Sequence, residues 1–487
     1  MREVVNSILN SAWFDTAFAV VAILTTVILI FIIISENRNP VKSLAWVTVL
    51  LLLPVFGIVL YIFFGRNIKN ERMISRRIRR RLRRKENKSS YSPARLNLSL
   101  ASSQQIMLGK SLTGAQFHGE NTVEIFTSGA DKFDALEEDL RNARKSINIQ
   151  YYIFDCDETG RRIARVLMDK AREGVTVRVI YDHVGSFNVR SRFFKEMIKA
   201  GVEAYPFFKV TFPQLATRVN WRNHRKICVI DNAIGYIGGM NIANRYIDGG
   251  KFPLWRDSHL RITGPVVDAI NYSFAVDWNF TTGKVLDMGS NHIGHEQLAR
   301  PGAIHGIGAQ VLTNGPTSQW HAIEMAFYKA ILNATKRVYI QTPYFLPTEG
   351  LLNALQTAAL AKVDVRIMVP LASDSKMLTL ASASYFKECL RSNIKIYQYE
   401  AGMLHAKMMI VDDELVSIGS TNFDFRSFEY NFEANVFCYS REFTQRMLEV
   451  FRNDLRSCIR ITADSWRHRP VLRKASESIL RLLSPVL

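Results

Sequence analysis

The chain has 487 residues, enough for two or three domains, and 63 Lys and Arg against 44 Asp and Glu give a formal net charge of +19. This excess favours an anionic partner, either nucleic acid or acidic lipid. The five cysteines are widely scattered and include no C-x-x-C pair, which excludes a disulfide framework and a cysteine zinc site.

Two long apolar runs come first. Residues 13–34 are apolar apart from Asp15 and three threonines, and a helix rising about 1.5 Å per residue would span the roughly 30 Å core of a bilayer. The run is too long for a signal peptide, and no small-residue cleavage site follows it. The second run, residues 43–64, contains a Pro and a Gly, which membrane helices tolerate. We therefore expect a two-helix transmembrane hairpin over residues 1–65.

A strongly basic segment follows. Residues 66–88 contain twelve basic and two acidic residues, about half of the positive excess, whereas the loop between the apolar runs has only Arg38 and Lys42. The positive-inside rule therefore predicts that both termini, and the body of the chain, are cytoplasmic.

Within this segment Ile74, Ile78 and Leu82 recur every four residues. This spacing suits one face of a helix lying along an anionic membrane surface, with a solvated linker as the alternative. The Ser-rich stretch over 89–110 is expected to be a linker. Residues 66–110 are thus predicted to form a basic juxtamembrane segment and a linker.

The remainder repeats itself at an interval of 180 to 190 residues. In each half a helix, an apolar strand, a second helix and a second apolar strand follow one another. We expect an α/β fold made of two duplicated domains, 111–300 and 301–487, each a mixed sheet flanked by helices and related by a pseudo-twofold axis. The predicted elements are residues 133–145, 147–154, 160–173 and 175–181 in the first half, and 322–334, 338–345, 350–361 and 363–369 in the second.

Each half also carries the same polar residues at the same spacing. A Lys follows the His after two positions, an Asp after seven and an Asn after seventeen; the copies are His224, Lys226, Asp231, Gly239 and Asn241, and His405, Lys407, Asp412, Ser420 and Asn422. On a strand, residues i and i+2 share a face, so each His emerges beside its Lys. An ammonium group is unfavourable in a dry core without a partner, so we expect both to face an anion. The small residues and the Asn let a ligand approach the backbone.

This residue set suits a phosphodiester. Two lysines would offset its negative charge. One neutral imidazole can attack phosphorus, while a protonated one donates a proton to the leaving alkoxide. A single site therefore needs two histidines in opposite protonation states, which accounts for the duplication.

The twin His-x-Lys-x4-Asp motifs resemble those of the phospholipase D superfamily. Together with the N-terminal runs they are most similar to the bacterial cardiolipin synthases, over essentially the whole chain. The resemblance implies that His224 is the nucleophile, forming a phosphohistidine, and that His405 is the general acid and base. Nothing in the residues themselves excludes the reverse assignment.

The resemblance also implies roles for the other motif residues. Lys226, Lys407, Asn241 and Asn422 would bind the phosphate, with Gly239 and Ser420 beside them. Asp257 and Glu433 match the carboxylates that orient the histidines in the family. Asp231 and Asp412 belong to the motifs, but their place at hairpin turns favours a structural role, and a structural role is also expected for His183 and His259.

The function implied is that of a phosphatidyltransferase in the cell membrane, multi-pass, with a cytoplasmic catalytic body. It would make cardiolipin and glycerol from two phosphatidylglycerol molecules, using no metal and no cofactor. The expected partners are phosphatidylglycerol and anionic membrane lipid, not nucleic acid, and the oligomeric state is left open. Four alternatives remain: a lipid hydrolase of the phospholipase D type, a transferase with phosphatidylethanolamine as donor, a membrane-tethered nuclease and a non-catalytic scaffold.

Two segments stay ambiguous. Residues 209–221 are longer than their counterpart in the second half and suit either a wall for acyl chains or a structural loop. The tail from Pro470 has apolar residues at helical spacing, for which core packing is the default expectation, with a membrane surface as the alternative.

Overall fold

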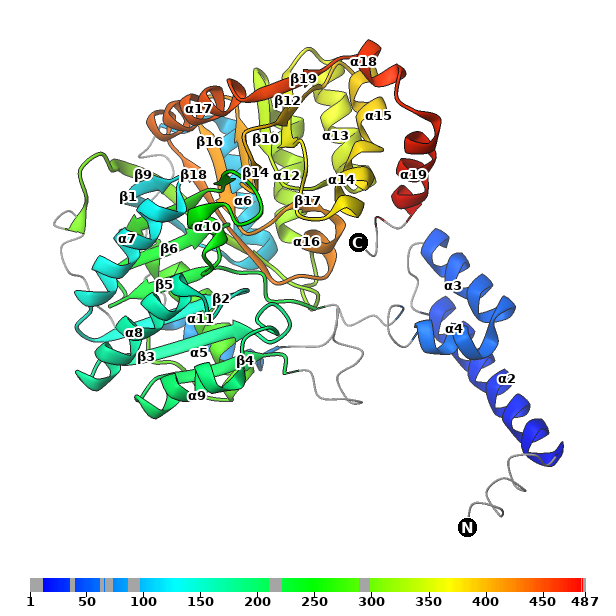
Figure 1. The fold of residues 1–487 in the computed structure, drawn as a ribbon, viewed down its shortest axis with the longest axis horizontal. Helices are drawn as coiled ribbons and strands as arrows, with labels where there is room; N and C mark the ends of the chain where they lie inside the picture. Colours follow the sequence, from blue (N-terminus) through cyan, green and yellow to red (C-terminus); the bar gives the residue numbers. More distant parts are fainter. Residues whose placement is uncertain are drawn as a thin grey trace. The chain divides into compact units, whose positions relative to one another are not determined.

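The computed structural model describes residues 12–35, 40–61, 65, 73–85, 97–209, 221–288, 298–482 and 484. They divide into two compact units. The N-terminal helices belong to one, and the chain from residue 69 onward, apart from 210–220, forms the other (Figure 1). The ambiguous loop over 210–220 lies outside the described residues.

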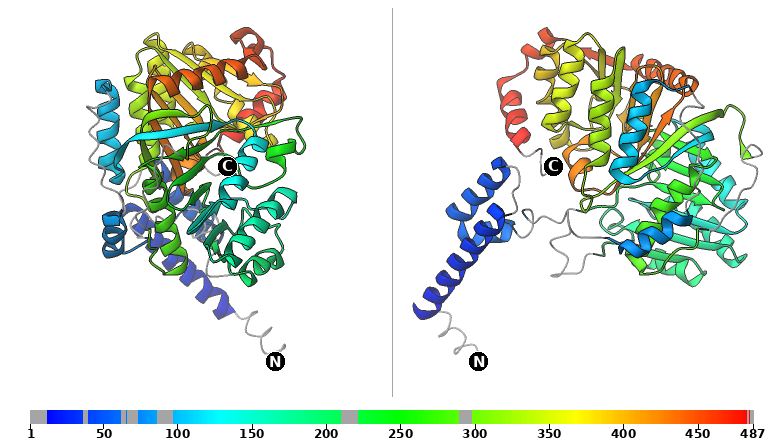
Figure 2. Two further views of the ribbon diagram at one scale, coloured as in Figure 1. Left: turned by 90° about the vertical axis from the view of Figure 1, so that its left-hand side faces the viewer. Right: turned by 180° about the vertical axis from the view of Figure 1, so that it is seen from behind.

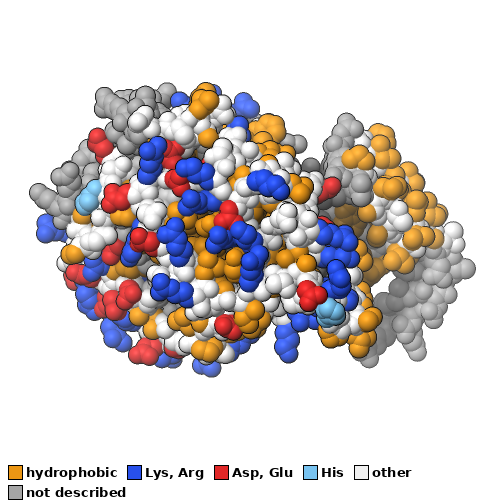
Figure 3. Space-filling view, turned by 90° about the horizontal axis from the view of Figure 1, so that it is seen from above, with side chains coloured by type: hydrophobic (Ala, Val, Ile, Leu, Met, Phe, Trp, Pro, Cys, Tyr) orange, Lys and Arg blue, Asp and Glu red, His pale blue; other side chains and the backbone are white. Residues whose placement is uncertain are grey.

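The N-terminal unit contains α2 (Ala12–Ser35), α3 (Pro40–Leu52) and α4 (Pro54–Leu60). Within α2, Thr16–Ser35 is long and apolar enough to cross a membrane. Ile33, Leu50 and Tyr61 form a small shared core, while most other apolar side chains of these helices are exposed (Figure 3). In water such exposure would be costly, so the surface of this unit suits a hydrocarbon solvent.

The second apolar run is not one continuous helix. Pro54 begins α4 and interrupts the helix at Leu53, because proline lacks the N–H and its ring clashes with the preceding turn. The chain then turns back, and a Cβ at Gly57 would lie 2.9 Å from the carbonyl oxygen of Val49. The 13 residues of α3 span only about 20 Å at 1.5 Å per residue. In the part of the chain that is described, α2 alone meets the length of a membrane span.

The second unit is built on one fifteen-stranded mixed sheet, in the order β19-β13-β12-β10-β15-β16-β18-β9-β1-β8-β6-β5-β2-β3-β4. The sequence predicted a mixed sheet with flanking helices, which is confirmed. It did not predict that the strands of both halves join edge to edge through β1 and β9, which pair antiparallel at the centre. The strands are β1 (Phe117–Phe126), β2 (Ser146–Tyr151), β3 (Thr176–Asp182), β4 (Glu203–Phe207), β5 (Ile227–Ile230), β6 (Ile234–Gly238), β8 (His259–Thr263), β9 (Ile304–Asn314), β10 (Arg337–Gln341), β12 (Asp364–Pro370), β13 (Lys395–Tyr399), β15 (Met408–Val411), β16 (Leu415–Gly419), β18 (Glu433–Tyr439) and β19 (Cys458–Ile461).

The two halves of this sheet have the same topology. Outward from the centre, β1-β8-β6-β5-β2-β3-β4 corresponds strand by strand to β9-β18-β16-β15-β10-β12-β13. Two further two-stranded sheets pair β11 (Phe345–Leu346) with β17 (Phe423–Asp424) and β7 (Trp255–Arg256) with β14 (Met403–Leu404). The second of these joins the two halves.

Helices cover the sheet on both sides (Figures 1 and 2). Three apolar clusters of the described residues fill the interior of this unit: one lies mainly in each half, and a third draws on both halves. Buried strand residues alternate between these clusters, as the pleat requires; Cys228 belongs to the first-half cluster and Val229 to the shared one. The helices are α7 (Gly129–Arg141), α8 (Glu158–Arg172), α9 (Ser191–Lys199), α10 (Arg245–Asp248), α11 (Val267–Thr282), α12 (Ala322–Asn333), α13 (Glu349–Leu360), α14 (Lys376–Ala383), α15 (Phe386–Arg391), α16 (Phe425–Glu429), α17 (Arg441–Leu455) and α18 (Ala463–Arg467).

The basic segment forms α5 (Arg76–Lys85), which packs on α11 (Figure 2). Ile74 and Leu82 are buried, and Arg83 donates hydrogen bonds to the hydroxyl of Tyr272 and to the carbonyl of Gly114. The expectation that this apolar stripe lies along a membrane is therefore wrong, because the protein itself covers the stripe.

Two other segments differ from expectation. Residues 100–113, expected to be part of a linker, form α6 (Leu100–Thr113), capped by Ser99 and by Gly114 in the left-handed conformation. The C-terminal helix α19 (Val471–Leu482) contacts α14, but Leu472 and Leu482 are 83% and 81% exposed. Core packing of these two leucines is therefore excluded.

Candidate active site

Each motif histidine is held by a strand of the opposite half. The backbone N–H of His224 donates to the carbonyl of Phe432, and that of His405 donates to the carbonyl of Arg256. Both acceptors directly precede a candidate carboxylate. This symmetric arrangement brings two histidines and two carboxylates, all far apart in sequence, to the junction of the halves.

The ring of His224 pairs with Glu433. Nδ1 lies 3.0 Å from Oε1 of the carboxylate and 3.0 Å from the carbonyl oxygen of Ser420. The hydroxyl of Ser420 also donates to Glu433, and the side-chain amide of Asn431 lies 3.3 Å from it. The carboxylate is thus fixed from three directions in a fully buried position.

The ring of His405 pairs with Asp257. Nδ1 lies 2.7 Å from the carboxylate, which also accepts the backbone N–H of Ser258. Lys407 lies close to the same ring, with its Nζ 2.6 Å from Nδ1 and 3.3 Å from Nε2. A Cβ at Gly239 would lie 2.1 Å from the Asp257 carboxylate, so any side chain there would displace it.

The pairing is crossed between the halves. Glu433 of the second half orients the histidine of the first, and Asp257 of the first orients that of the second. In both cases Nδ1 faces the carboxylate, so Nε2 is the nitrogen left for a substrate. The sequence singled out both carboxylates without indicating that each would serve the other half.

Burial determines the protonation state of the two histidine rings. It lowers the pKa of His405 to about 4, with Lys407 adding to the effect and Asp257 opposing it. Burial likewise lowers the pKa of His224, against the opposing charge of Glu433. Both rings are therefore neutral at pH 7 until an anion arrives, because a nearby negative charge favours the imidazolium form.

The carboxylates and lysines complete the electrostatics. Burial alone would raise the pKa of Glu433 and Asp257, but the neighbouring histidine and lysine charges bring both below their usual values. Burial lowers the pKa of Lys407 to about 8 and that of Lys226 well below its usual range, with Lys407 adding to the shift of Lys226 and Glu433 and Asp257 opposing it. Charged groups of the two halves thus shift one another's pKa values, as expected if they form a single site.

Lys226 is buried, and its Nζ donates to the carbonyl of His224 at 2.6 Å. The side-chain amide of Asn241 is also occupied: it donates to the hydroxyl of Tyr246 and accepts from the backbone N–H of Ile153. In contrast, Oδ1 of Asn422 is buried and has no hydrogen-bond partner among the residues that the structure covers.

Aromatic rings, which the motifs did not indicate, line the two histidines. Tyr152 lies 5.0 Å from the ring of His224, and Trp255 and Tyr246 lie 5.3 and 6.0 Å from that of His405. Tyr152 directly follows β2 and Trp255 opens β7. Of these three rings, only that of Trp255 could have been found from the sequence, because Trp255 stands two residues before the candidate Asp257.

Asp231 and Asp412 occupy equivalent hairpin turns with positive φ values of 53° and 52°. The carboxylate of Asp231 accepts three successive backbone N–H groups, from residues 144–146, and Asp412 accepts those of residues 335–337. Each therefore joins its hairpin to the start of the neighbouring strand.

The two histidines that were expected to be structural, His183 and His259, lie outside the two motifs. His259 is fully buried, and burial lowers its pKa well below the usual value. The backbone of His183 donates to the carbonyl of Phe207. Across the described ranges, no group of three or more His, Cys, Asp or Glu residues is arranged to hold a metal ion.

Comparison with known proteins finds two matching family models and several sequence relatives. The model of the family described as "Cardiolipin synthase, PLD-like domain" matches residues 136–252 and 327–455, and that described as "Phospholipase D-nuclease N-terminal" matches residues 23–66. The major cardiolipin synthase of Bacillus subtilis is 36% identical over 99% of this chain and 100% of its own length. Cardiolipin synthase 2 of Bacillus anthracis is 37% identical over 94% of this chain and 89% of its own.

A solved structure shares the fold. Phosphatidylserine synthase of Haemophilus influenzae superposes with a TM-score of 0.60 at 16% identity, over 79% of this chain and 100% of its own. The likeness covers the large mixed sheet with its flanking helices.

Proposed function

Because the chain belongs to the cardiolipin synthase family with phospholipase D-like domains, we propose that it transfers a phosphatidyl group between two phosphatidylglycerol molecules, forming cardiolipin and glycerol. The observation that carries the proposal is the crossed pairing of His224 with Glu433 and of His405 with Asp257. Two imidazoles held from opposite halves provide the nucleophile and the acid that a phosphodiester exchange requires.

In the first step, Nε2 of His224 attacks the phosphorus of the donor. A nitrogen–phosphorus bond forms and the bond to the glycerol oxygen breaks. His405, protonated once the anionic phosphate is bound, gives its proton to the departing oxygen, and glycerol leaves. Glu433 stabilises the positive charge that develops on the His224 ring.

In the second step, the free hydroxyl of another phosphatidylglycerol gives its proton to His405. Its oxygen attacks phosphorus, the nitrogen–phosphorus bond breaks, and cardiolipin leaves with both histidines restored. The exchange replaces one phosphodiester by another, so it needs no nucleotide. The reverse assignment of the two histidines would use the same geometry.

The lysines and Asn422 would bind the phosphate. Lys226 and Lys407 would offset its charge in a buried site, where such interactions are strong. Asn422 would donate from its side-chain amide nitrogen, whereas Asn241, whose amide is occupied, would act by holding Tyr246 in place. In this scheme Asp231 and Asp412 stabilise the hairpins that carry the motifs.

The protein would work in the cell membrane. The length and composition of α2 support a membrane span, and the broken α3–α4 segment would complete a hairpin by re-entering the bilayer. The basic residues after residue 65 favour a cytoplasmic catalytic body. A membrane anchor would keep the active unit near abundant lipid acceptors, and exclusion of water from the buried site would favour transfer over hydrolysis.

The test uses the full-length protein in detergent micelles with phosphatidylglycerol as the sole lipid. We expect equal amounts of cardiolipin and glycerol, and a His224→Ala variant should form neither above background. His468→Ala, an exposed histidine outside the motifs, is the matched control and should keep full activity. Phosphatidic acid as the main product would instead identify a hydrolase, and an undiminished yield from His224→Ala would remove the proposed mechanism.

A further inference from the structure

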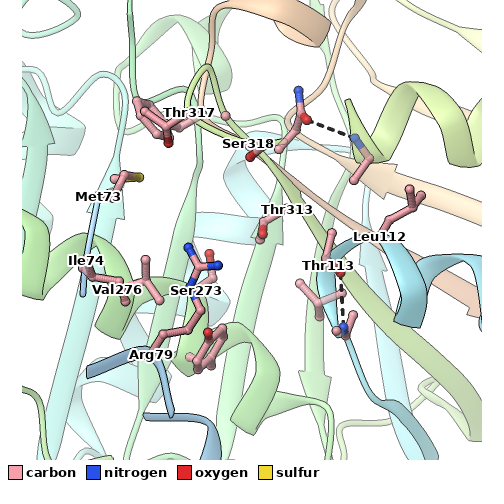
Figure 4. A pocket seen from close by; sticks show the side chains of 18 of the residues that line it. Met73, Ile74, Arg79, Leu112, Thr113, Ser273, Val276, Thr313, Thr317 and Ser318 are labelled. Carbon is pink, nitrogen blue, oxygen red and sulfur yellow. Dashed lines mark hydrogen bonds between the residues drawn. The ribbon is translucent and has the colours of Figure 1, made fainter. Parts of the chain in front are cut away.

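A cavity of about 650 Å³ lies between α5, α6, α11 and β9. Figure 4 shows side chains from these elements around one hollow. Its volume falls in the range of about 300–1,000 Å³ that is usual for small-molecule sites. The catalytic histidines, lysines and carboxylates are not among its lining residues.

The lining has a marked charge bias. Four arginines contribute to it and no acidic residue does, among the residues that the structure describes; they are Arg76, Arg79, Arg83 and Arg225. The guanidinium of Arg225 is occupied, because it pairs with Asp277 at 2.6 Å and donates to the carbonyls of Glu433 and Asn314. Arg83 is bound to α6 and Tyr272.

Arg76 and Arg79, one helical turn apart on α5, have no carboxylate partner within the described ranges. Two adjacent guanidinium groups repel each other unless an anion lies between them. The planar fork of arginine matches the oxygen atoms of a phosphate. The cavity therefore offers two cationic side chains one helical turn apart, without a carboxylate partner among the described residues, that could hold one anion.

A further donor lies beside Arg79 (Figure 4), on the helix that α5 packs against. Ser273 on α11 is 2% exposed, and its hydroxyl has no hydrogen-bond partner in the part of the chain that is described. A buried hydroxyl without a partner costs free energy, which a ligand or an ordered water would offset. Thr313, Thr317 and Ser318 add further hydroxyl-bearing side chains elsewhere in the lining.

The cavity also has an apolar part, formed by Ile74, Leu112, Val276 and Trp320. A lining that combines cations, hydroxyls and apolar groups suits a molecule with a phosphate at one end and carbon at the other. Inorganic phosphate would use only the polar part.

We propose that this cavity is a second, non-catalytic binding site for a phosphate group, held by Arg76, Arg79 and the hydroxyl of Ser273. The ligand is a phosphomonoester or phosphodiester anion. The phosphate comes either from a phospholipid headgroup or from solution, and the titrations below distinguish these sources.

The wall of the cavity includes two residues that adjoin catalytic residues in sequence. Arg225 directly follows His224, and Phe432 directly precedes Glu433; both line the cavity, and the carbonyl of Phe432 accepts the N–H of His224. Two residues of the cavity wall are therefore sequence neighbours of the two members of one catalytic pair.

The experiment is a calorimetric titration of the full-length protein in neutral detergent, with His224→Ala present throughout, in the reference protein and in every variant, so that phosphatidylglycerol is bound but not converted. The titrants are dihexanoyl phosphatidylglycerol, inorganic phosphate and, as a zwitterionic control, dihexanoyl phosphatidylcholine. The double variant Arg76→Gln/Arg79→Gln should bind an anionic titrant about tenfold or more weakly than the reference protein, since each charge-assisted hydrogen bond to phosphate contributes strongly. Ser273→Ala should weaken binding by a few-fold in the same titration.

The matched control is Arg77→Gln/Arg80→Gln, which removes the same charge from exposed positions of the same helix outside the cavity lining. It should bind like the reference protein. Loss for phosphatidylglycerol alone identifies a lipid headgroup site, and loss for both anions identifies a general phosphate site. Equal binding by all variants, or equal loss in the control variant, would overturn the proposal. Thermal melting of each variant shows that it is folded.

Discussion

Glu433 accepts a hydrogen bond from Nδ1 of His224 across 209 positions of sequence, and the carboxylate that orients each histidine comes from the other half of the sheet. A half-chain would therefore contain a complete motif without the carboxylate that fixes its ring. Both halves are required for one working site.

The first prediction concerns this carboxylate. Glu433→Gln keeps the size of the side chain but removes the charge that stabilises a positive His224 ring. We expect turnover to fall by about 10²–10⁴-fold, the upper end being the loss known for replacing the carboxylate behind a catalytic imidazole by an amide. The initial rate of cardiolipin formation from phosphatidylglycerol measures this, and Glu442→Gln, on the exposed side of α17, should retain the wild-type rate. A Glu433→Gln rate within twofold of wild type would contradict the proposed role.

Gly239 provides a second test. A methyl group at this position would lie 2.1 Å from the Asp257 carboxylate, so Gly239→Ala should push Asp257 away from His405. We expect turnover to fall by at least about tenfold, since small displacements of catalytic groups are costly. Gly350→Ala, at the exposed start of α13 with nothing closer than 3.9 Å, should change neither turnover nor melting temperature. Full activity of Gly239→Ala would show that the carboxylate tolerates displacement.

The hairpin aspartates should affect stability without affecting chemistry. Asp412→Ala leaves three backbone N–H groups and the Thr335 hydroxyl without their acceptor, and we expect a loss of about 1–3 kcal/mol. The neighbouring Asp413→Ala removes only surface ion pairs with Lys336 and Arg337, which contribute about 0–1 kcal/mol each. Thermal melting in detergent should separate the two variants clearly. Turnover per folded molecule should stay near wild type in both, and a specific loss in Asp412→Ala would assign it to catalysis.

The fourth prediction concerns pH. Burial lowers the pKa of His405 to about 4 in the folded protein, whereas an unfolded histidine titrates near about 6.5. Between these values the unfolded chain binds more protons, so the stability of the ligand-free protein should fall as pH drops from about 6.5 to about 4.

His405→Gln should reduce this loss, because glutamine does not titrate. Melting temperatures of the wild type and the variant, measured from pH 7 down to pH 4, test the expectation. His468→Gln, on an exposed histidine, should follow the wild-type curve. If the melting curves of His405→Gln and the wild type fell in parallel over this range, the inferred neutral state of His405 would be wrong.

Much of the site could be predicted because its chemistry is encoded locally. The His–Lys step of two reflects the pleat of a strand, and the repeated spacing indicated two equivalent halves. The crossed pairing could not be predicted, since both carboxylates follow their own motif in sequence. Only the strand order, which brings Arg256 beside Leu404 and Phe432 beside His224, decides which ring each carboxylate meets.

The errors in the fold have physical causes. The second apolar run was expected to be one continuous helix, but Pro54 lacks the N–H that the helix would need and divides the run. Ile74 and Leu82 form an apolar stripe whose partner is decided by tertiary contacts. In the fold α5 packs on α11, and both side chains are buried. The serines near residue 100 suggested a linker, although Ser99 is the cap of α6. Local patterns identify amphipathic or capped segments, but they do not identify what those segments meet.

The antiparallel pairing of β1 with β9 limits how substrates are exchanged. The two strands join the halves through main-chain hydrogen bonds in the middle of the sheet, and separating them would expose those groups at considerable cost. The two halves are therefore not expected to separate as rigid bodies during turnover. Glycerol must depart and the second lipid must arrive through an opening formed by loops and side chains, while the sheet stays joined.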